Sequence, residues 1–152
     1  MKQHPFSFTR FCTLIWLFVF GAWLPLQAVP AKELQAQAMV TAWIQLIDEG
    51  KYESAWKQTA PFFMEAISVE DWVSSLNEVR KPLGAVKSRQ VKRLFYTTML
   101  PGAPEAEYVV VQFETVFAGR DLPVLETITP MLVPHTDNPA KGTWKVSGYY
   151  IQ

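Results

Sequence analysis

One basic side chain stands at the border of an apolar helical stripe. Arg80 follows Leu76 by four residues, in a segment whose apolar residues repeat with the spacing of a helix. A guanidinium in this position has to find an acceptor or extend outward to water. Glu126 is the best candidate acceptor, because it shares a strand parity with apolar neighbours such as Ile128. Glu114 is the second candidate. We therefore expect Arg80 to pair with a strand carboxylate.

Three functions are open to such a pair. It can be a structural ion pair between helix and sheet, a polar group at the base of a ligand pocket, or part of an acid–base site. A carboxylate that acts as a base in a pocket has to be free of cations. An arginine partner stabilises the charged form and so works against a base.

Aromatic side chains offer a second kind of site. Four tryptophans follow residue 30, and they fit either the core or the lining of a pocket for an apolar ligand: Trp43, Trp56, Trp72 and Trp144. Tyr149 and Tyr150 are adjacent in a strand-like segment and point to opposite faces. The candidate pocket residues are Arg80, Glu126, Trp72 and Tyr149.

Other chemistries lack the residues they need. His135 lies in a turn-forming segment without a spaced set of further ligands, so we expect no metal site. No Gly-x-Ser-x-Gly, phosphate loop or dinucleotide motif occurs, and we expect no cofactor. The single cysteine is Cys12, so the chain after residue 28 has no disulfide or thiol nucleophile.

The charge balance argues against nucleic acid as a partner. Without Lys2 and Arg10, the 14 basic residues of the chain become 12, against 14 acidic residues, a formal charge of −2. A near-neutral domain lacks the excess of basic residues with which proteins bind the phosphates of nucleic acid. The densest basic stretch is interpreted as a solvated strand face: Lys87, Arg89, Lys92 and Arg93.

The first 28 residues are typical of a cleaved export signal. A basic start without acidic residues precedes an apolar run over residues 11–24, and Ala28 follows soon after. The run is short for a bilayer span, which needs about 20 residues. We predict cleavage after Ala28 and a periplasmic or secreted protein without a permanent membrane span. An uncleaved anchor is the alternative.

Residues 29–152 are predicted to form one domain. Helical spacing predicts helices over residues 31–49, 52–59 and 68–83, with residues 61–64 as an apolar connector. Strand-like composition follows over residues 86–100, 107–117, 124–133 and 143–151. Segregated helices and strands predict an α+β fold, with three N-terminal helices packed on a curved four-stranded antiparallel sheet. The strands carry apolar residues at both odd and even positions. We therefore expect that both faces of the sheet can be covered, one by the helices and the other by a partner or a curled strand.

Several stretches together resemble a known family. They are residues 42–44, 46–50, 52–56, 80–84, 100–102, 107–110, 112–115 and 144–151, together with Trp72 and residues 126–127. In order and spacing the chain resembles the bacterial family of exported proteins catalogued as domain of unknown function 4019. By layout alone it is also similar to the nuclear-transport-factor-2-like cone. Neither resemblance implies a function, since the cone serves enzymes, binding modules and dimerisation domains.

The sequence favours a non-catalytic exported domain that binds a small ligand or a protein partner. A small hydrolase or isomerase that uses a buried carboxylate is the alternative, and a structural envelope protein is the third possibility. A homodimer through a sheet face is expected.

Overall fold

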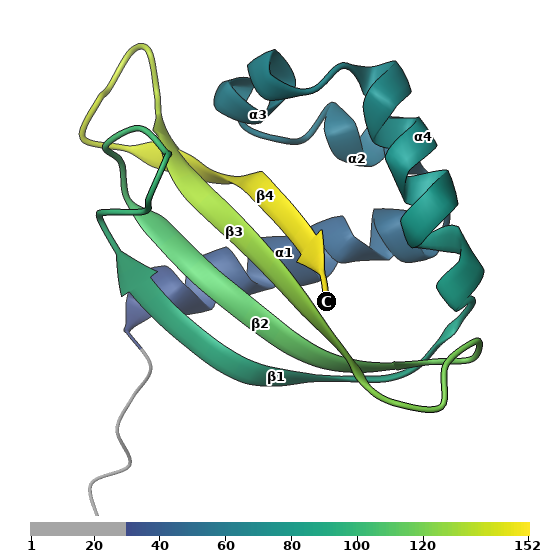
Figure 1. The fold of residues 1–152 in the computed structure, drawn as a ribbon. Helices are drawn as coiled ribbons and strands as arrows, with labels where there is room; N and C mark the ends of the chain where they lie inside the picture. The colour runs from purple at the N-terminus through teal and green to yellow at the C-terminus, as the bar shows by residue number, and fades with distance from the viewer. Residues whose placement is uncertain (1–29) are drawn as a thin grey trace, which may run out of the picture.

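The computed structural model describes residues 30–152 as four α-helices, one short 3₁₀ helix and four β-strands (Figure 1). The helices are α1 (Ala31–Asp48), α2 (Tyr52–Trp56), α3 (Pro61–Ala66), α4 (Val69–Val79) and the 3₁₀ helix η1 (Lys81–Leu83). The strands are β1 (Val86–Thr97), β2 (Tyr108–Phe117), β3 (Val124–Pro134) and β4 (Gly142–Ile151). This arrangement confirms the α+β class. The predicted signal over residues 1–28 lies outside the described residues.

Helix α1 forms where the sequence repeats apolar residues at helical spacing. Its buried residues include Val40, Trp43, Ile44 and Ile47, which form one stripe along the helix. Gly50 follows with a φ of +72°, a left-handed conformation that glycine adopts without steric cost. The predicted end of this helix at Gly50 is therefore confirmed.

Helix α4 begins with a side-chain cap. The Ser68 Oγ accepts a hydrogen bond from the backbone N–H of Asp71 at 3.1 Å. Trp72 and Leu76 are buried, but Val79 is 52% exposed. The helix ends at Val79, and the chain turns through η1 to Gly84, whose φ is +76°. Val79 therefore lies outside the buried stripe of this helix.

The predicted connector over residues 61–64 is wrong, because these residues begin helix α3. Proline is well suited to the first turn of a helix, where its missing N–H is not needed. Pro61 therefore starts a helix, and α2 has already ended at Trp56. The domain has four α-helices among its described residues instead of the three expected.

The four strands form one antiparallel sheet in the order β1-β2-β3-β4. Each strand pairs with its neighbour in the sequence, as Figure 1 shows. The strand bounds lie within three residues of those predicted. Two register shifts interrupt β1, one between Val86 and Ser88 and one between Val91 and Arg93. A third shift interrupts the β3–β4 pairing between Thr129 and Pro130. These bulges change which residues point to which face of the sheet.

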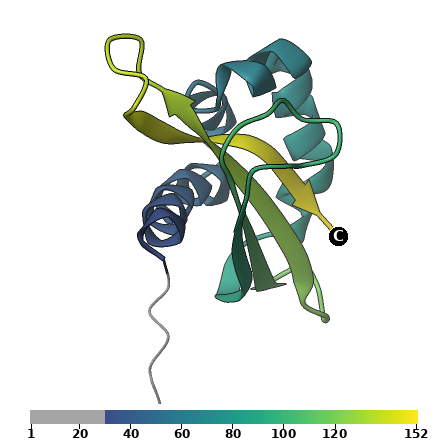
Figure 2. The same cartoon turned by 90° about the vertical axis from the view of Figure 1, so that its left-hand side faces the viewer.

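Helices cover one face of the sheet. Helix α1 contacts all four strands, and Figure 2 shows it nearly end-on beside the sheet. The core between them includes Trp43, Val111, Ile128 and Val146. No helix of the described residues is long and apolar enough to cross a membrane.

The other face of the sheet has less cover. The loop over residues 98–107 packs near Tyr108, whose hydroxyl donates to the Pro104 carbonyl at 2.6 Å. Tyr150 on the same face is 63% exposed. The cone-like shape and the homodimer stay predictions.

Candidate functional site

Glu126 is a fully buried carboxylate surrounded by donors. It points from β3 to the helix side, and its side chain has no exposed surface. Its Oε1 accepts from the Tyr149 hydroxyl at 2.6 Å. Its Oε2 accepts from the Arg89 Nε at 2.9 Å and from the Thr115 hydroxyl. Both oxygens are thus engaged, as a buried charge requires.

The ion pairs continue from Glu126 to the end of α1. Arg89 donates from its two terminal nitrogens to both carboxylate oxygens of Asp48, at 2.6 and 2.9 Å. Asp48 also accepts from the Arg80 Nη2 at 2.8 Å. Arg80 further donates to the Gly84 carbonyl at 2.9 Å and stacks over the Phe117 ring at 4.4 Å. Tyr149 and these four charged residues form one network, which joins β4, β3, β1, the end of α1 and the residue after α4. It is fully buried at Glu126 and reaches the surface at Asp48.

The predicted pair between Arg80 and Glu126 is therefore wrong. Arg80 follows Val79, the last residue of α4, and its guanidinium pairs with Asp48 at the end of α1 instead of with a strand carboxylate. The cation at Glu126 is Arg89, which lies opposite Thr115 in the β1–β2 pairing. Glu114, the second candidate acceptor, pairs with Lys92 at the surface.

Arg89 also corrects the prediction of a solvated basic face on β1. Its side chain is only 13% exposed, whereas Lys87, Lys92 and Arg93 are exposed as expected. The register shift between Val86 and Ser88 places Arg89 opposite Thr115, on the face of the sheet that carries Glu126.

Electrostatics hold the network in its charged form. Burial alone would raise the pKa of Asp48, but hydrogen bonds and charge attraction from Arg89 and Arg80 outweigh it, and the pKa is lowered. Burial likewise opposes the charge of Arg89, yet Asp48 and Glu126 together raise its pKa. Burial and the adjacent Glu126 charge raise the pKa of Tyr149, so its hydroxyl stays protonated and donates.

The lowered pKa of Asp48 makes stability depend on pH. A carboxyl whose pKa is lower in the folded state stabilises the fold above its unfolded value and loses this contribution as the pH falls. Urea unfolding of the wild type should therefore show stability falling as the pH drops below 3.8, the ordinary value for Asp48. Asp48→Asn should show a shallower slope there. Asp137→Asn, in the exposed loop before β4, should keep the wild-type slope. Equal slopes in Asp48→Asn and wild type would contradict this assignment.

A cavity of about 590 Å³ lies beside Tyr149. We call it the aromatic pocket. It is lined from α3, α4, the loop after β1 and the end of β4, and the residues are Phe62, Phe63, Ala66, Ile67, Trp72, Ser75, Leu100, Pro101, Gly102, Ala103, Tyr108, Thr129, Ser147, Gly148, Tyr149 and Tyr150. None of these described residues carries a charge. Such a lining suits an apolar, uncharged group with a few polar contacts.

Aromatic contacts hold the inner wall of this pocket in place. The Trp72 ring packs edge-on against Phe63 at 5.3 Å and against Tyr149 at 6.3 Å, measured between ring centres. Tyr149 also meets Trp43 edge-on at 5.7 Å. The Trp72 indole N–H donates to the Tyr52 carbonyl at 3.0 Å. These contacts and the Tyr149–Glu126 hydrogen bond give the pocket a preformed wall.

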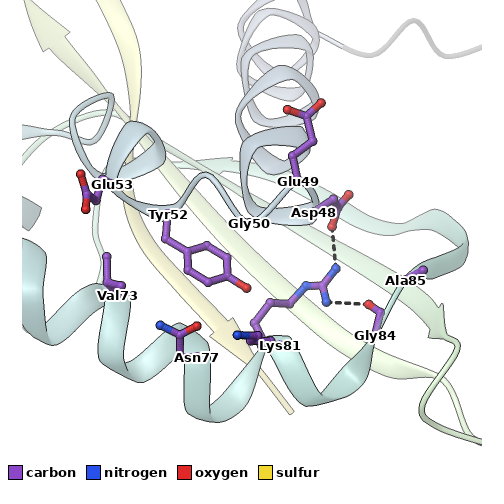
Figure 3. A pocket seen from close by; sticks show the side chains of 11 residues that line it. Asp48, Glu49, Gly50, Tyr52, Glu53, Val73, Asn77, Lys81, Gly84 and Ala85 are labelled. Atoms are coloured by element: carbon purple, nitrogen blue, oxygen red, sulfur yellow. Dashed lines mark hydrogen bonds and ion pairs between the residues drawn. The ribbon is translucent and has the colours of Figure 1, made fainter.

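A second cavity, of about 570 Å³, lies at the end of α1. Figure 3 shows Tyr52 extending between this helix end and α4, with Asn77 and Lys81 along α4 and η1. Dashed lines mark the hydrogen bonds that reach Asp48 and Gly84, both donated by Arg80. Acidic and basic side chains mix in this lining, so we call it the polar cavity. The network that begins with the Tyr149–Glu126 hydrogen bond ends at this cavity, with Asp48 and Arg80.

The four predicted site residues do not share one pocket. Trp72 and Tyr149 line the aromatic pocket, while Arg80 lines the polar cavity. Glu126 lines neither and lies beneath Tyr149. Sequence reasoning missed Asp48 and Arg89 as members of the network. Asp48 follows the buried Ile47 directly at a helix end, but nothing in its spacing distinguishes it from an exposed residue.

Comparison with known proteins identifies a family but no activity. Within the curated proteins nothing matches the chain. The family model for a protein of unknown function (DUF4019) matches residues 39–149, which include Asp48, Arg80, Arg89, Glu126, Trp72 and Tyr149. The match covers well over half of the chain, and the chain belongs to this family of unknown function, DUF4019.

Proposed function

We propose that this chain is a non-catalytic binding domain whose aromatic pocket takes a small, apolar, uncharged molecule. The observation that carries the proposal is the uncharged lining of a cavity of about 590 Å³. Ligand pockets of about 300–1,000 Å³ with an apolar lining and few polar groups are typical of small-molecule sites. The predicted export signal over residues 1–28 would place this domain outside the cytoplasm.

The contacts of Glu126 favour binding over catalysis. Glu126 hydrogen-bonds to Tyr149 of the aromatic pocket wall, and its two oxygens accept from three donors in all. A general base has to accept a proton from a substrate within hydrogen-bond reach. Glu126 is buried behind Tyr149 and is neutralised by Arg89, so it is poorly suited to this role.

The test uses a probe that fits the pocket's chemistry. N-phenyl-1-naphthylamine is apolar, uncharged and aromatic, and its fluorescence rises in apolar surroundings. We expect it to bind the domain over residues 29–152 with a saturable fluorescence increase. Ala66→Trp, which places a large ring at the pocket lining, should weaken this binding at least tenfold.

The matched control is Ala42→Trp, which adds the same ring at an exposed position of α1 outside the pocket. It should bind the probe as the wild type does. Absence of saturable binding, or equal loss in both variants, would count against the aromatic pocket as the site.

A further inference from the structure

Strand β4 has a free edge along its last residues. The backbone groups of Leu125 and Gln152 bond each other in both directions at 2.9 Å. In an antiparallel pair, hydrogen-bonded and non-hydrogen-bonded residue pairs alternate. Tyr150 opposite Thr127 therefore bonds to β3, while Tyr149 and Ile151 turn their backbone N–H and C=O groups away from it.

These outward groups have no partner within residues 30–152. Outside the pairing of β3 with β4, no backbone or side-chain hydrogen bond of the described residues reaches the main chain of Tyr149 or Ile151. A backbone donor and acceptor without a partner are a template for an added strand.

Another segment of the protein already pairs with the same edge of β4 at Val146, on the N-terminal side of Tyr149. Thr59 forms a parallel bridge with Val146, and the Ala60 N–H donates to the Val146 carbonyl at 2.7 Å. This segment leaves β4 at Ala60 and continues into α3. The edge is thus occupied at Val146 and open from Ser147 to Ile151.

The aromatic pocket lies over this open part of the edge. Its lining includes Ser147, Gly148, Tyr149 and Tyr150, four consecutive residues of β4. Tyr149 faces the helices, while Tyr150 points to the opposite face and is exposed. A cavity lined from both faces passes along the edge between them, and Figure 2 shows the loop after β1 crossing in front of β4.

We propose that the aromatic pocket binds an extended peptide segment of a protein partner, which pairs with the free edge of β4 and places an uncharged apolar side chain among the aromatic rings. The proposal rests on the proposed function, because it uses the same uncharged pocket, and it assigns that pocket to an apolar side chain of a partner protein instead of a free small molecule. In this mode of recognition the main-chain hydrogen bonds give affinity, and the pocket selects the side chain.

The walls of the pocket favour a single peptide over a second copy of the chain. Phe63 of α3 and Trp72 of α4 stand across the pocket from β4. A second copy would have to bring a whole four-stranded sheet into this space. One extended segment needs only the width of a strand, about 5 Å in the hydrogen-bonding direction.

The experiment uses capped pentapeptides, Ac-Thr-Val-Xaa-Val-Thr-NH₂, with Phe, Leu, Trp or Val at Xaa, and Asp as the charged control. We expect at least one apolar peptide to bind the domain over residues 29–152 and to displace N-phenyl-1-naphthylamine. The Asp peptide should bind at least tenfold more weakly. Hydrogen exchange followed by NMR should slow at least tenfold at the Tyr149 and Ile151 amides when the peptide is added.

Backbone methylation supplies the matched control for strand pairing. For the best peptide, one version carries N-methyl groups on residues 2 and 4, and the other on residues 3 and 5. Only one set of N–H groups can face β4, so one version should lose at least tenfold in affinity and the other should stay close to the parent.

The outcomes separate this inference from the proposed function. If the naphthylamine probe binds but no apolar peptide does, or both methylated versions bind equally, strand pairing is wrong and a small-molecule pocket remains. If neither probe nor peptide binds, both proposals fail. If the two amides become protected with rising protein concentration alone, a second copy occupies the edge, and the peptide partner is wrong.

Discussion

Arg89→Met is expected to lower the free energy of unfolding by about 3–5 kcal/mol, because it leaves the fully buried Glu126 charge without its cation. Methionine keeps much of the side-chain volume, so the loss reports the charge more than the packing. Urea unfolding at neutral pH measures it. Lys92→Met is the matched control on the same strand, where the lysine pairs with Glu114 at the surface and should contribute little.

A double-mutant cycle separates the pair from its surroundings. Glu126→Gln removes the charge but keeps the shape, and in the background of Arg89→Met it should recover part of the lost stability. The double variant should therefore lose less than the sum of the two single variants. Additive losses would show that Arg89 and Glu126 do not stabilise each other, and would contradict the network.

Trp43→Ala is expected to cost about 3–5 kcal/mol of stability. Trp43 is 1% exposed and lies at the centre of the core, with its ring against those of Trp72 and Tyr149. Its removal opens a cavity and also leaves the Ala55 carbonyl without the indole N–H that reaches it at 2.9 Å. Thermal or urea unfolding gives the measurement.

The matched control for Trp43 lies on the same helix. Leu34 is 52% exposed, and Leu34→Ala should stay within about 0.5 kcal/mol of the wild type. A Trp43→Ala variant as stable as Leu34→Ala would mean that α1 does not pack on the sheet through this stripe.

Local signals predicted most of the fold. One helical face carries Val40, Trp43, Ile44 and Ile47, and this spacing is typical of an amphipathic helix. Composition marked the strands, and turn residues marked their ends. Helix α3 was missed because its six residues bury no side chain fully, so no periodic stripe exists to be detected.

The site was less predictable, because ion pairing depends on geometry between distant elements. Asp48 and Arg89 are 41 residues apart in the sequence, and only the packing of α1 across the sheet brings them together. Arg80 was correctly predicted to need an acceptor near the core, but its acceptor came from a helix end instead of a strand. Arg89 was predicted to be solvated from the density of basic residues around it, and the bulge between Val86 and Ser88 that turns it inward has no signal in that density.

The aromatic half of the site was predicted better than the charged half. Trp72 and Tyr149 both line the pocket, because large aromatic side chains at inward positions pack between the helices and the sheet. The contribution of residues 100–103 was not predicted, because a turn sequence indicates a reversal of the chain and says nothing of where the loop packs.

The position of α1 across all four strands has a consequence for the order of synthesis. Chains emerge from the ribosome N-terminus first, so the stripe of Val40, Trp43, Ile44 and Ile47 is made long before the strands that cover it. β4, which supplies Val146 and Tyr149 to the same core, is made after the other three strands of this sheet. Until β4 is made, the stripe on α1 stays partly uncovered, and exposed apolar surface of this kind makes a nascent chain prone to aggregation.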